Sequence, residues 1–341
     1  MLRWIGLISN PNNKFCNRII SISFKIILIF VNVDNWAILI TRKKPTQAVS
    51  FLAHLTTYAL ASATWCITYL KRNRFSHLLH KLQKQSLTLH ERKTNFLVVI
   101  ICFIPLLLAV TTTLTIGTDP TFFTYGYKID DLRILFLIVT LKNFLYTLIF
   151  PTLTNAIALL FCLLCVQVST VIRRLTEDIT LCSPNNFIIS KQLEKIKEKS
   201  DVDDILDGIQ DIFSMSSFFI IISNVSTCAS VLSLYLHSNS ISVVTSIEWT
   251  LYATNSLGCL VAVLWIAGGV TVNDQKFKES FHRKSKLRMF LDAIPTEPRL
   301  ERWLFDKPDF VFNGWGILPY RRVTVFAVIG ALVTYTVLIV N

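Results

Sequence analysis

The sequence predicts an all-α membrane protein with seven transmembrane helices, a cytosolic N-terminus and an extracellular C-terminus. The first observation behind this prediction is composition. Hydrophobic residues make up 52% of the 341 residues and charged residues only 16%, against about 25% charged residues in soluble domains. The second observation is a set of apolar runs that are long enough to cross a bilayer. The third is the uneven distribution of Lys and Arg residues between these runs.

Seven apolar runs reach the ~20 residues that a helix needs to cross a ~30 Å hydrocarbon core. They cover residues 19–40, 48–70, 95–116, 144–171, 212–236, 247–270 and 322–340. The first run lacks a small-residue cleavage pattern, so it is expected to span the membrane rather than act as a secretory signal. Its two charges, Lys25 and Asp34, are expected to reach opposite interfaces.

The apolar stretch 132–172 is too long for one span. Lys142 and Asn143 are expected to divide it into an outer segment and the fourth span, and Pro151 is expected to kink that span. Arg173 and Arg174 mark its cytosolic end.

The Lys and Arg residues orient the chain. Of the 34, three precede the first run, seven lie in 71–94, six in 173–211 and eleven between 271 and 322, whereas the loops on the other side hold five. Because cytosolic loops carry the excess of these residues, the N-terminus is expected in the cytosol. The net charge of +12 then reflects orientation and contact with anionic membrane lipid, and no nucleic-acid partner is expected.

The predicted organisation has four parts: a cytosolic N-terminus (1–18), a bundle of helices 1–6 (19–270, with cytosolic segments 71–94 and 173–211), a cytosolic anchor segment (271–316) and a seventh helix (317–341). Apolar residues recur at helical spacing between charges in 187–211 and 275–312, which predicts amphipathic helices. These helices can form a subunit interface or lie on the membrane surface.

The sequence shows no catalytic or metal-binding pattern, so no enzymatic activity, cofactor or metal is expected. The eight cysteines lie mostly within the apolar runs and are typical of small packing residues. Cys162 and Cys165 have no second Cys/His pair at matching spacing, and His77, His80 and His90 have no matching ligand residues.

A small-molecule site is predicted in the outer halves of the spans, where aromatic residues occur with a few amides. The candidate residues are Tyr58, Tyr146, Asn155, Trp249, Tyr252 and Asn255. This combination suits an apolar pocket with few polar contacts. It suits an aromatic belt at the membrane interface equally well.

The last apolar run differs from a simple membrane anchor. It begins at Arg322, passes through Gly330, and carries the pair Thr334-Tyr335, which five residues separate from Asn341. Polar residues near the end of an apolar helix are typical of a helix that lines a pore or contacts copies of itself.

The segment Gly316-Ile-Leu-Pro-Tyr-Arg-Arg322, followed by Gly330-Ala and Thr334-Tyr335, resembles the C-terminal signature of arthropod gustatory receptors. That signature reads roughly Gly-Phe-Phe-x-hydrophobic-x-Arg, then a helix with Gly-Ala, Thr-Tyr, five hydrophobic residues and Gln-Phe. Asn341 stands at the position of the Gln. The motif covers about 26 residues, and the inverted seven-helix topology extends the likeness over the whole chain.

The resemblance implies a homo- or heterotetrameric, ligand-gated, non-selective cation channel that a small-molecule tastant opens. It implies a location in the plasma membrane, in sensory neuron dendrites, with membrane lipid and related subunits as partners. It also implies that the seventh helix lines the pore, with Thr334, Tyr335, Leu338 and Asn341 at or near the gate.

Two alternatives remain open. A G-protein-coupled chemoreceptor needs an extracellular N-terminus, and the sequence lacks both an Asp/Glu-Arg-Tyr at the end of its third run and an Asn-Pro-x-x-Tyr in its seventh. A secondary transporter is expected to show an internal repeat with matching broken helices and paired charges at the middle of the membrane, and neither is expected from this sequence.

Overall fold

A computed structural model describes residues 14–41, 48–84, 91–115, 124–125, 127, 129–237, 242–292 and 308–340. Nearly all of this part of the chain is helical, which confirms the predicted all-α class. The elements are α1 (Lys14–Thr41), α2 (Ala48–Leu70), α3 (Arg72–Lys84), α4 (Glu91–Thr115), α5 (Leu132–Thr147), the π-helix η4 (Leu148–Leu153), α6 (Thr154–Leu181), the short η5 (Pro184–Asn186), α7 (Ile189–His237), α8 (Val243–Asp292), β1 (Asn313–Gly314), β2 (Leu318–Pro319) and α10 (Arg322–Val340).

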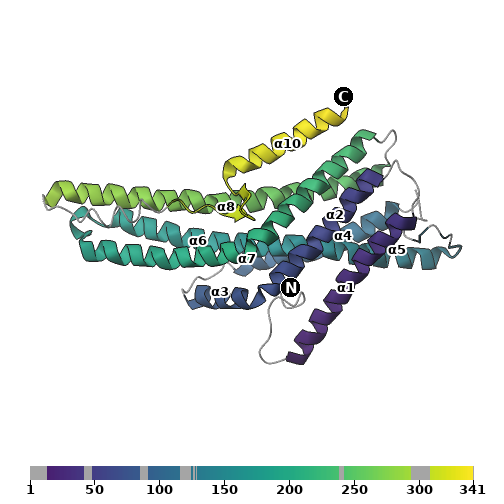
Figure 1. The fold of residues 1–341 in the computed structure, drawn as a ribbon, viewed down its shortest axis with the longest axis horizontal. Helices are drawn as coiled ribbons and strands as arrows, with labels where there is room; N and C mark the ends of the chain where they lie inside the picture. Colours follow the sequence, from purple (N-terminus) through teal and green to yellow (C-terminus); the bar gives the residue numbers. More distant parts are fainter. Residues whose placement is uncertain are drawn as a thin grey trace.

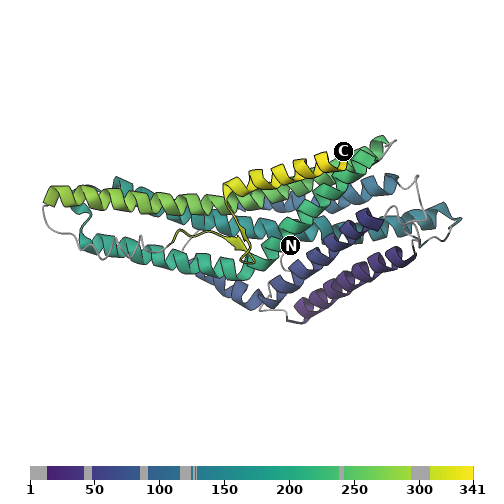
Figure 2. The ribbon, with the colours of Figure 1, turned by 45° about the horizontal axis from the view of Figure 1, so that its top comes forward.

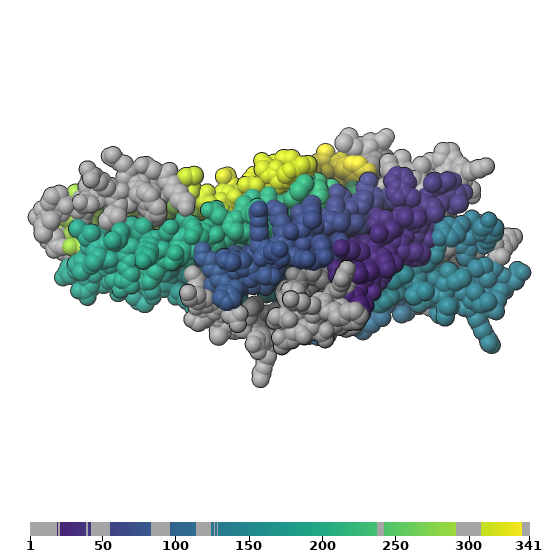
Figure 3. Space-filling model, turned by 60° about the horizontal axis from the view of Figure 1, so that its bottom comes forward, coloured from purple at the N-terminus to yellow at the C-terminus, as the bar shows by residue number. Residues whose placement is uncertain are grey.

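The molecule is elongated, and its long axis follows α6, α7 and α8 (Figure 1). These three helices extend to the end at the left of Figure 1, whereas α1, α2, α4, α5 and α10 surround them toward the other end. The most extensive helix contacts are those of α2 with α7 and of α6 with α8. Figure 3 shows α3, α2 and α1 along one face of the molecule.

The apolar runs of the sequence are helices with closely similar bounds, as α1, α2, α4 and α10 show. Within the described residues, five helical segments are long and apolar enough to cross a membrane, by length and composition. Their outward side chains are apolar too, among them Ile29 at 65% exposure and Phe103 at 59%. Such surfaces are stable in lipid, not in water. A multi-pass membrane protein is therefore supported, while the count of seven spans stays a prediction.

The apolar stretch 132–172 is interrupted at a different place from the predicted one. Lys142 and Asn143 do not break the chain, because both lie within α5. The backbone leaves helical geometry at Phe150 (φ −134°, ψ 123°), directly before Pro151. Proline lacks a backbone N–H and pushes the preceding residue out of the α region. The predicted kink at Pro151 is thus confirmed, and the predicted break at Lys142-Asn143 is wrong.

The amphipathic segment predicted at 187–211 forms the first part of α7, in one continuous helix with its apolar part. The segment predicted at 275–312 forms the last part of α8 as far as residue 292. Their charged residues bond to each other within this chain. Lys199 pairs with Asp203 of α7 and, at 2.7 Å, with Asp274 of α8. Lys278 reaches Asp309 at 2.9 Å. The hydrogen bond from Gln275 and this cation hold the pKa of the Asp309 carboxyl below its ordinary value.

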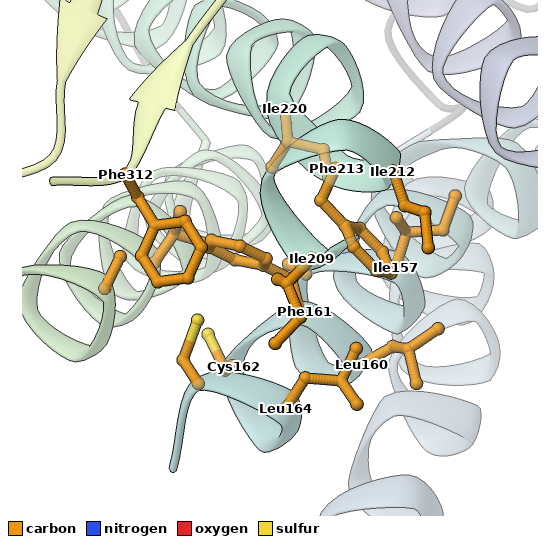
Figure 4. Close-up of a cluster of buried hydrophobic side chains, with 14 of the residues drawn as sticks. Ile157, Leu160, Phe161, Cys162, Leu164, Ile209, Ile212, Phe213, Ile220 and Phe312 are labelled. Atoms are coloured by element: carbon orange, nitrogen blue, oxygen red, sulfur yellow. The ribbon is translucent and has the colours of Figure 1, made fainter. Parts of the chain in front are cut away.

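An aromatic core joins the long helices to the segment that precedes α10. The ring of Phe161 in α6 lies 5.6 Å from that of Phe213 in α7 and 5.5 Å from that of Phe312. Figure 4 shows Phe161 among side chains of α6 and α7, with Phe312 reaching in from the strand side. Aromatic pairs at such distances contribute beyond the area that they bury. This core fixes where the last helix begins.

A short hairpin, β1 and β2, turns the chain into α10. Trp315 and Gly316 adopt left-handed backbone conformations (φ 52° and 72°) at its tip. The buried Tyr320 hydroxyl forms a 2.8 Å hydrogen bond with Ser217 of α7. The Arg322 guanidinium lies over the ring of Trp265 in α8, 4.9 Å from its centroid. From there α10 runs along α7 and α8 (Figure 2), and most of its described side chains beyond Val328 are exposed.

Gly268 of α8 allows the close approach of the start of α10. A Cβ atom at this position would lie 2.7 Å from the backbone nitrogen of Arg322. We expect Gly268→Ala to destabilise the protein by about 1–3 kcal/mol, because backbone atoms cannot rotate away from the new methyl group. The matched control is Gly258→Ala in the same helix, where a Cβ meets nothing within 4 Å. That change should be neutral or stabilise by up to about 1 kcal/mol. Thermal unfolding of the two purified variants checks both expectations, and equal melting temperatures would contradict the close contact.

Candidate ligand-binding site

Three aromatic side chains meet where α2 crosses the bend between α5 and α6. The ring centroid of Tyr58 in α2 lies 5.7 Å from that of Tyr146 in α5 and 6.2 Å from that of Phe150. All three side chains are buried. The non-helical backbone at Phe150 places this ring beside Tyr58 instead of on the regular face of a helix. The structure therefore brings together two of the predicted site residues, Tyr58 and Tyr146, with a third ring that the sequence did not single out.

Two predicted amides meet one turn beyond this cluster. The Asn155 side chain of α6 donates a hydrogen bond from Nδ2 to Oδ1 of Asn255 in α8, with a length of 2.7 Å. Within the described residues, Asn155 Oδ1 and Asn255 Nδ2 have no partner and are buried, as are Thr152 Oγ1 and Ser256 Oγ. A buried polar atom without a partner costs about 1–3 kcal/mol. The amide pair therefore presents one acceptor and one donor that a polar group of a ligand can satisfy.

One face of α8 carries Asn255 and two further polar side chains. Glu248, Tyr252 and Asn255 are four and three residues apart, so they lie on the same side of the helix. Glu248 accepts a 2.6 Å hydrogen bond from Thr112 of α4. Tyr252 lies on this face between Glu248 and Asn255. This face thus contacts α4 at Glu248 and α6 at Asn255, and Glu248 is a residue that the sequence analysis did not identify.

Trp249 is not part of this group. Its ring packs against Tyr235 of α7, with 5.1 Å between centroids at an interplanar angle of 84°. The Tyr235 hydroxyl donates to the backbone oxygen of Ser246 at 2.7 Å. Trp249 therefore contributes to the contact between α7 and α8.

A buried ion pair supports the aromatic cluster from α1. Asp34 accepts hydrogen bonds from the hydroxyls of Tyr146 and Tyr125, and Lys142 of α5 donates to the same carboxylate at 2.9 Å. The Asp34 side chain is 1% exposed and that of Lys142 is 11% exposed. The prediction that Asp34 reaches the membrane interface is therefore wrong. The sequence could have predicted this pair, because Asp34 and Lys142 are opposite charges within apolar runs. Such charges have the lowest free energy in a membrane when they pair with each other.

The predicted pore residues lie on or beyond α10. Thr334 and Tyr335 are exposed, and the Thr334 hydroxyl donates to the Gly330 backbone oxygen at 2.9 Å. Leu338 belongs to α10, but its side chain lies outside the described part of the structure. Asn341 lies wholly outside the described residues. The described residues contain no group of three or more His, Cys, Asp or Glu side chains that could hold a metal ion. Nothing observed thus tests the predicted gate.

Two solved structures of one receptor resemble this fold. The insect olfactory receptor OR5 from Machilis hrabei superposes with a TM-score of 0.80 at 9% sequence identity, over 100% of this chain and 95% of that chain. The same receptor in complex with eugenol gives a TM-score of 0.71 at 11% identity, over 99% of this chain and 95% of that chain. No protein-family model and no curated protein matches the sequence. At such low identities the likeness establishes the fold alone: an all-helical chain folded like an insect olfactory receptor over its full length.

Proposed function

We propose that this protein is a chemosensory receptor of the gustatory type, which forms a tetrameric, non-selective cation channel opened by a small-molecule tastant. The observation that carries the proposal is the site between α2, α5, α6 and α8. There, buried aromatic rings adjoin an amide pair with an unpartnered acceptor and donor. Such sites combine apolar walls with a few directional polar groups.

The fold supports the receptor part of the proposal. The structure matches an insect olfactory receptor over its full length, and that receptor also occurs in a complex with eugenol. The gustatory part of the proposal is supported by the signature residues Gly316, Arg322 and Gly330. They lie in the turn before α10 and in α10 itself, the helix that the resemblance assigns to the pore.

The pore part of the proposal rests on α10. Its mean composition is strongly apolar, yet Val323, Phe326 and Val333 are exposed at 58% or more in a single chain. Four copies of this face around an axis would bury them and form a constriction that excludes water until the helices separate. Ligand binding opens such a gate only if the ligand binds the open state more tightly. The cytosolic ends of α7 and α8 would then hold the four subunits together in the plasma membrane.

Two measurements on whole cells test this function. Tags on the two termini, stained before and after permeabilisation, should show a hidden N-terminus and an exposed C-terminus, and the reverse pattern would instead favour a G-protein-coupled receptor. Currents evoked by a tastant library should persist under G-protein blockade. Leu338→Ala and Asn341→Ala should change leak or ion selectivity, while Asn10→Ala, before the first run, should not. Unchanged leak and selectivity in both pore variants would contradict the assignment of α10 to the pore.

A further inference from the structure

Two cations converge on one aromatic ring where α1, α2 and α3 meet. The Lys25 ammonium of α1 lies 4.7 Å from the ring centroid of Tyr69 in α2, and the Arg72 guanidinium of α3 lies 4.4 Å from it. Two further contacts hold this ring in place: Trp65 stacks on it at 4.9 Å, and the Ser21 hydroxyl donates to the tyrosine hydroxyl at 3.4 Å. Figure 3 shows the three helices together on one face of the molecule. The two cations therefore belong to one surface site.

The positive charge of this site is not balanced by the chain itself. Within the part of the chain that the structure describes, neither Lys25 nor Arg72 forms an ion pair with a carboxylate. Their neighbours Lys71 and Arg74, by contrast, both pair with Asp211 of α7, at 3.3 Å and 2.6 Å. Arg72 is exposed and Lys25 is partly exposed, so both can reach a group outside the chain. Two like charges beside one ring repel each other, and an anion that contacts both would lower this repulsion.

An apolar stripe on the surface of α1 begins directly after Lys25. Its side chains recur at helical spacing and are all more than half exposed: Ile26, Ile29, Val33 and Trp36. The helix axis rises about 16 Å from Lys25 to Trp36, which is close to half of a ~30 Å hydrocarbon core. A lipid acyl chain can therefore lie along this stripe while the headgroup of the same lipid lies at the two cations.

We infer that an anionic phospholipid binds at this site, with its headgroup phosphate at Lys25 and Arg72 and one acyl chain along the apolar stripe of α1. Anionic lipids give the cytoplasmic leaflet its negative surface potential. The sequence predicts that this end of α2 faces the cytosol, because the following segment 71–94 holds seven Lys and Arg residues. A zwitterionic lipid with the same chains binds less tightly, since its own ammonium group offsets the charge of its phosphate. The lipid site is separate from the proposed tastant site.

Matched lipids and two double variants test the site. The full-length protein is purified in a neutral detergent and titrated with dioleoyl phosphatidylglycerol or dioleoyl phosphatidylcholine, and native mass spectrometry measures the bound lipid. Wild type should bind phosphatidylglycerol at least about fivefold more tightly, the factor that one cation at a membrane surface contributes. Lys25→Gln with Arg72→Gln removes both charges and should abolish this preference. Lys25→Arg with Arg72→Lys keeps both charges and should retain it.

A control with the same loss of charge separates this site from a general effect of basic residues. Arg173→Gln with Lys191→Gln removes two cations from exposed ion pairs and should leave the preference unchanged. Equal binding of the two lipids, a preference that survives the loss of both Lys25 and Arg72 charges, or an equal loss in the control would each overturn the inference. Inorganic phosphate at the concentration of the lipid should not displace phosphatidylglycerol, because it lacks acyl chains. Displacement would indicate a site for free phosphate and would overturn the assignment to a lipid.

Discussion

Replacing Asp34 by leucine is expected to destabilise the protein by about 3–5 kcal/mol. The change removes the carboxylate that accepts hydrogen bonds from Tyr125, Tyr146 and Lys142. It leaves the Lys142 ammonium in a site where the side chain is only 11% exposed. A buried charge that loses its ion-pair partner costs far more than the loss of an exposed ion pair. Thermal or denaturant unfolding of the purified protein measures the effect.

The reciprocal change should be milder. Lys142→Met leaves Asp34 with two tyrosine hydroxyl donors, so part of the carboxylate's hydrogen bonding survives. The double variant, Asp34→Leu with Lys142→Met, should recover most of the lost stability, because it removes both charges from the apolar environment. Additive losses in the double variant would contradict a direct pairing. Lys81→Met, at an exposed pair with Asp204, is the control and should cost no more than about 1 kcal/mol.

The same cycle tests the proposed ligand site, because the Tyr146 hydroxyl bonds to Asp34 while its ring packs on Tyr58. A ligand among these rings therefore meets side chains that α1 holds in place. We expect the double variant to fold but to bind agonists more weakly than wild type, since the Tyr146 hydroxyl loses its acceptor and the ring its fixed orientation. Ligand titrations on the folded double variant separate this effect from loss of stability.

A second large effect is expected at the opposite end of the molecule. Lys199→Met should also destabilise the protein by about 3–5 kcal/mol. The Lys199 side chain is 4% exposed and bridges Asp203 of α7 and Asp274 of α8. Without its ammonium, two carboxylates remain close together in a buried contact between the two helices, where their repulsion is weakly screened. Unfolding of the purified variant again measures the loss.

Lys191→Met is the matched control for this prediction. Lys191 lies in the same helix, but its pair with Glu194 is exposed, with 43% and 52% of the two side chains accessible. This variant should differ from wild type by no more than about 0.5 kcal/mol. If the two lysine variants lost equal stability, the Lys199 bridge would not be a determinant of the contact between α7 and α8.

Several features of the fold follow directly from the residues. The bounds of α2 and α10 coincide with apolar runs, because a helix that satisfies its own backbone is the stable form of an apolar stretch in lipid. The kink at Pro151 follows from the missing N–H. The pairing of Asn155 with Asn255, in contrast, depends on how α6 and α8 are rotated against each other, which no local pattern specifies.

The sequence by itself determined the helical class and the bounds of the apolar helices, because these depend on composition and periodicity, whereas a site formed by aromatic and amide residues stays a prediction. Only the tertiary structure decided which members meet: Tyr58 with Tyr146, Trp249 with Tyr235, and Asp34 with Lys142. Asp34 and Lys142 are 108 residues apart in the chain, and each alone is compatible with reaching the membrane surface. Their burial as a pair is stable only when α1 and α5 are packed together, because then the attraction of the two charges offsets the loss of water around them.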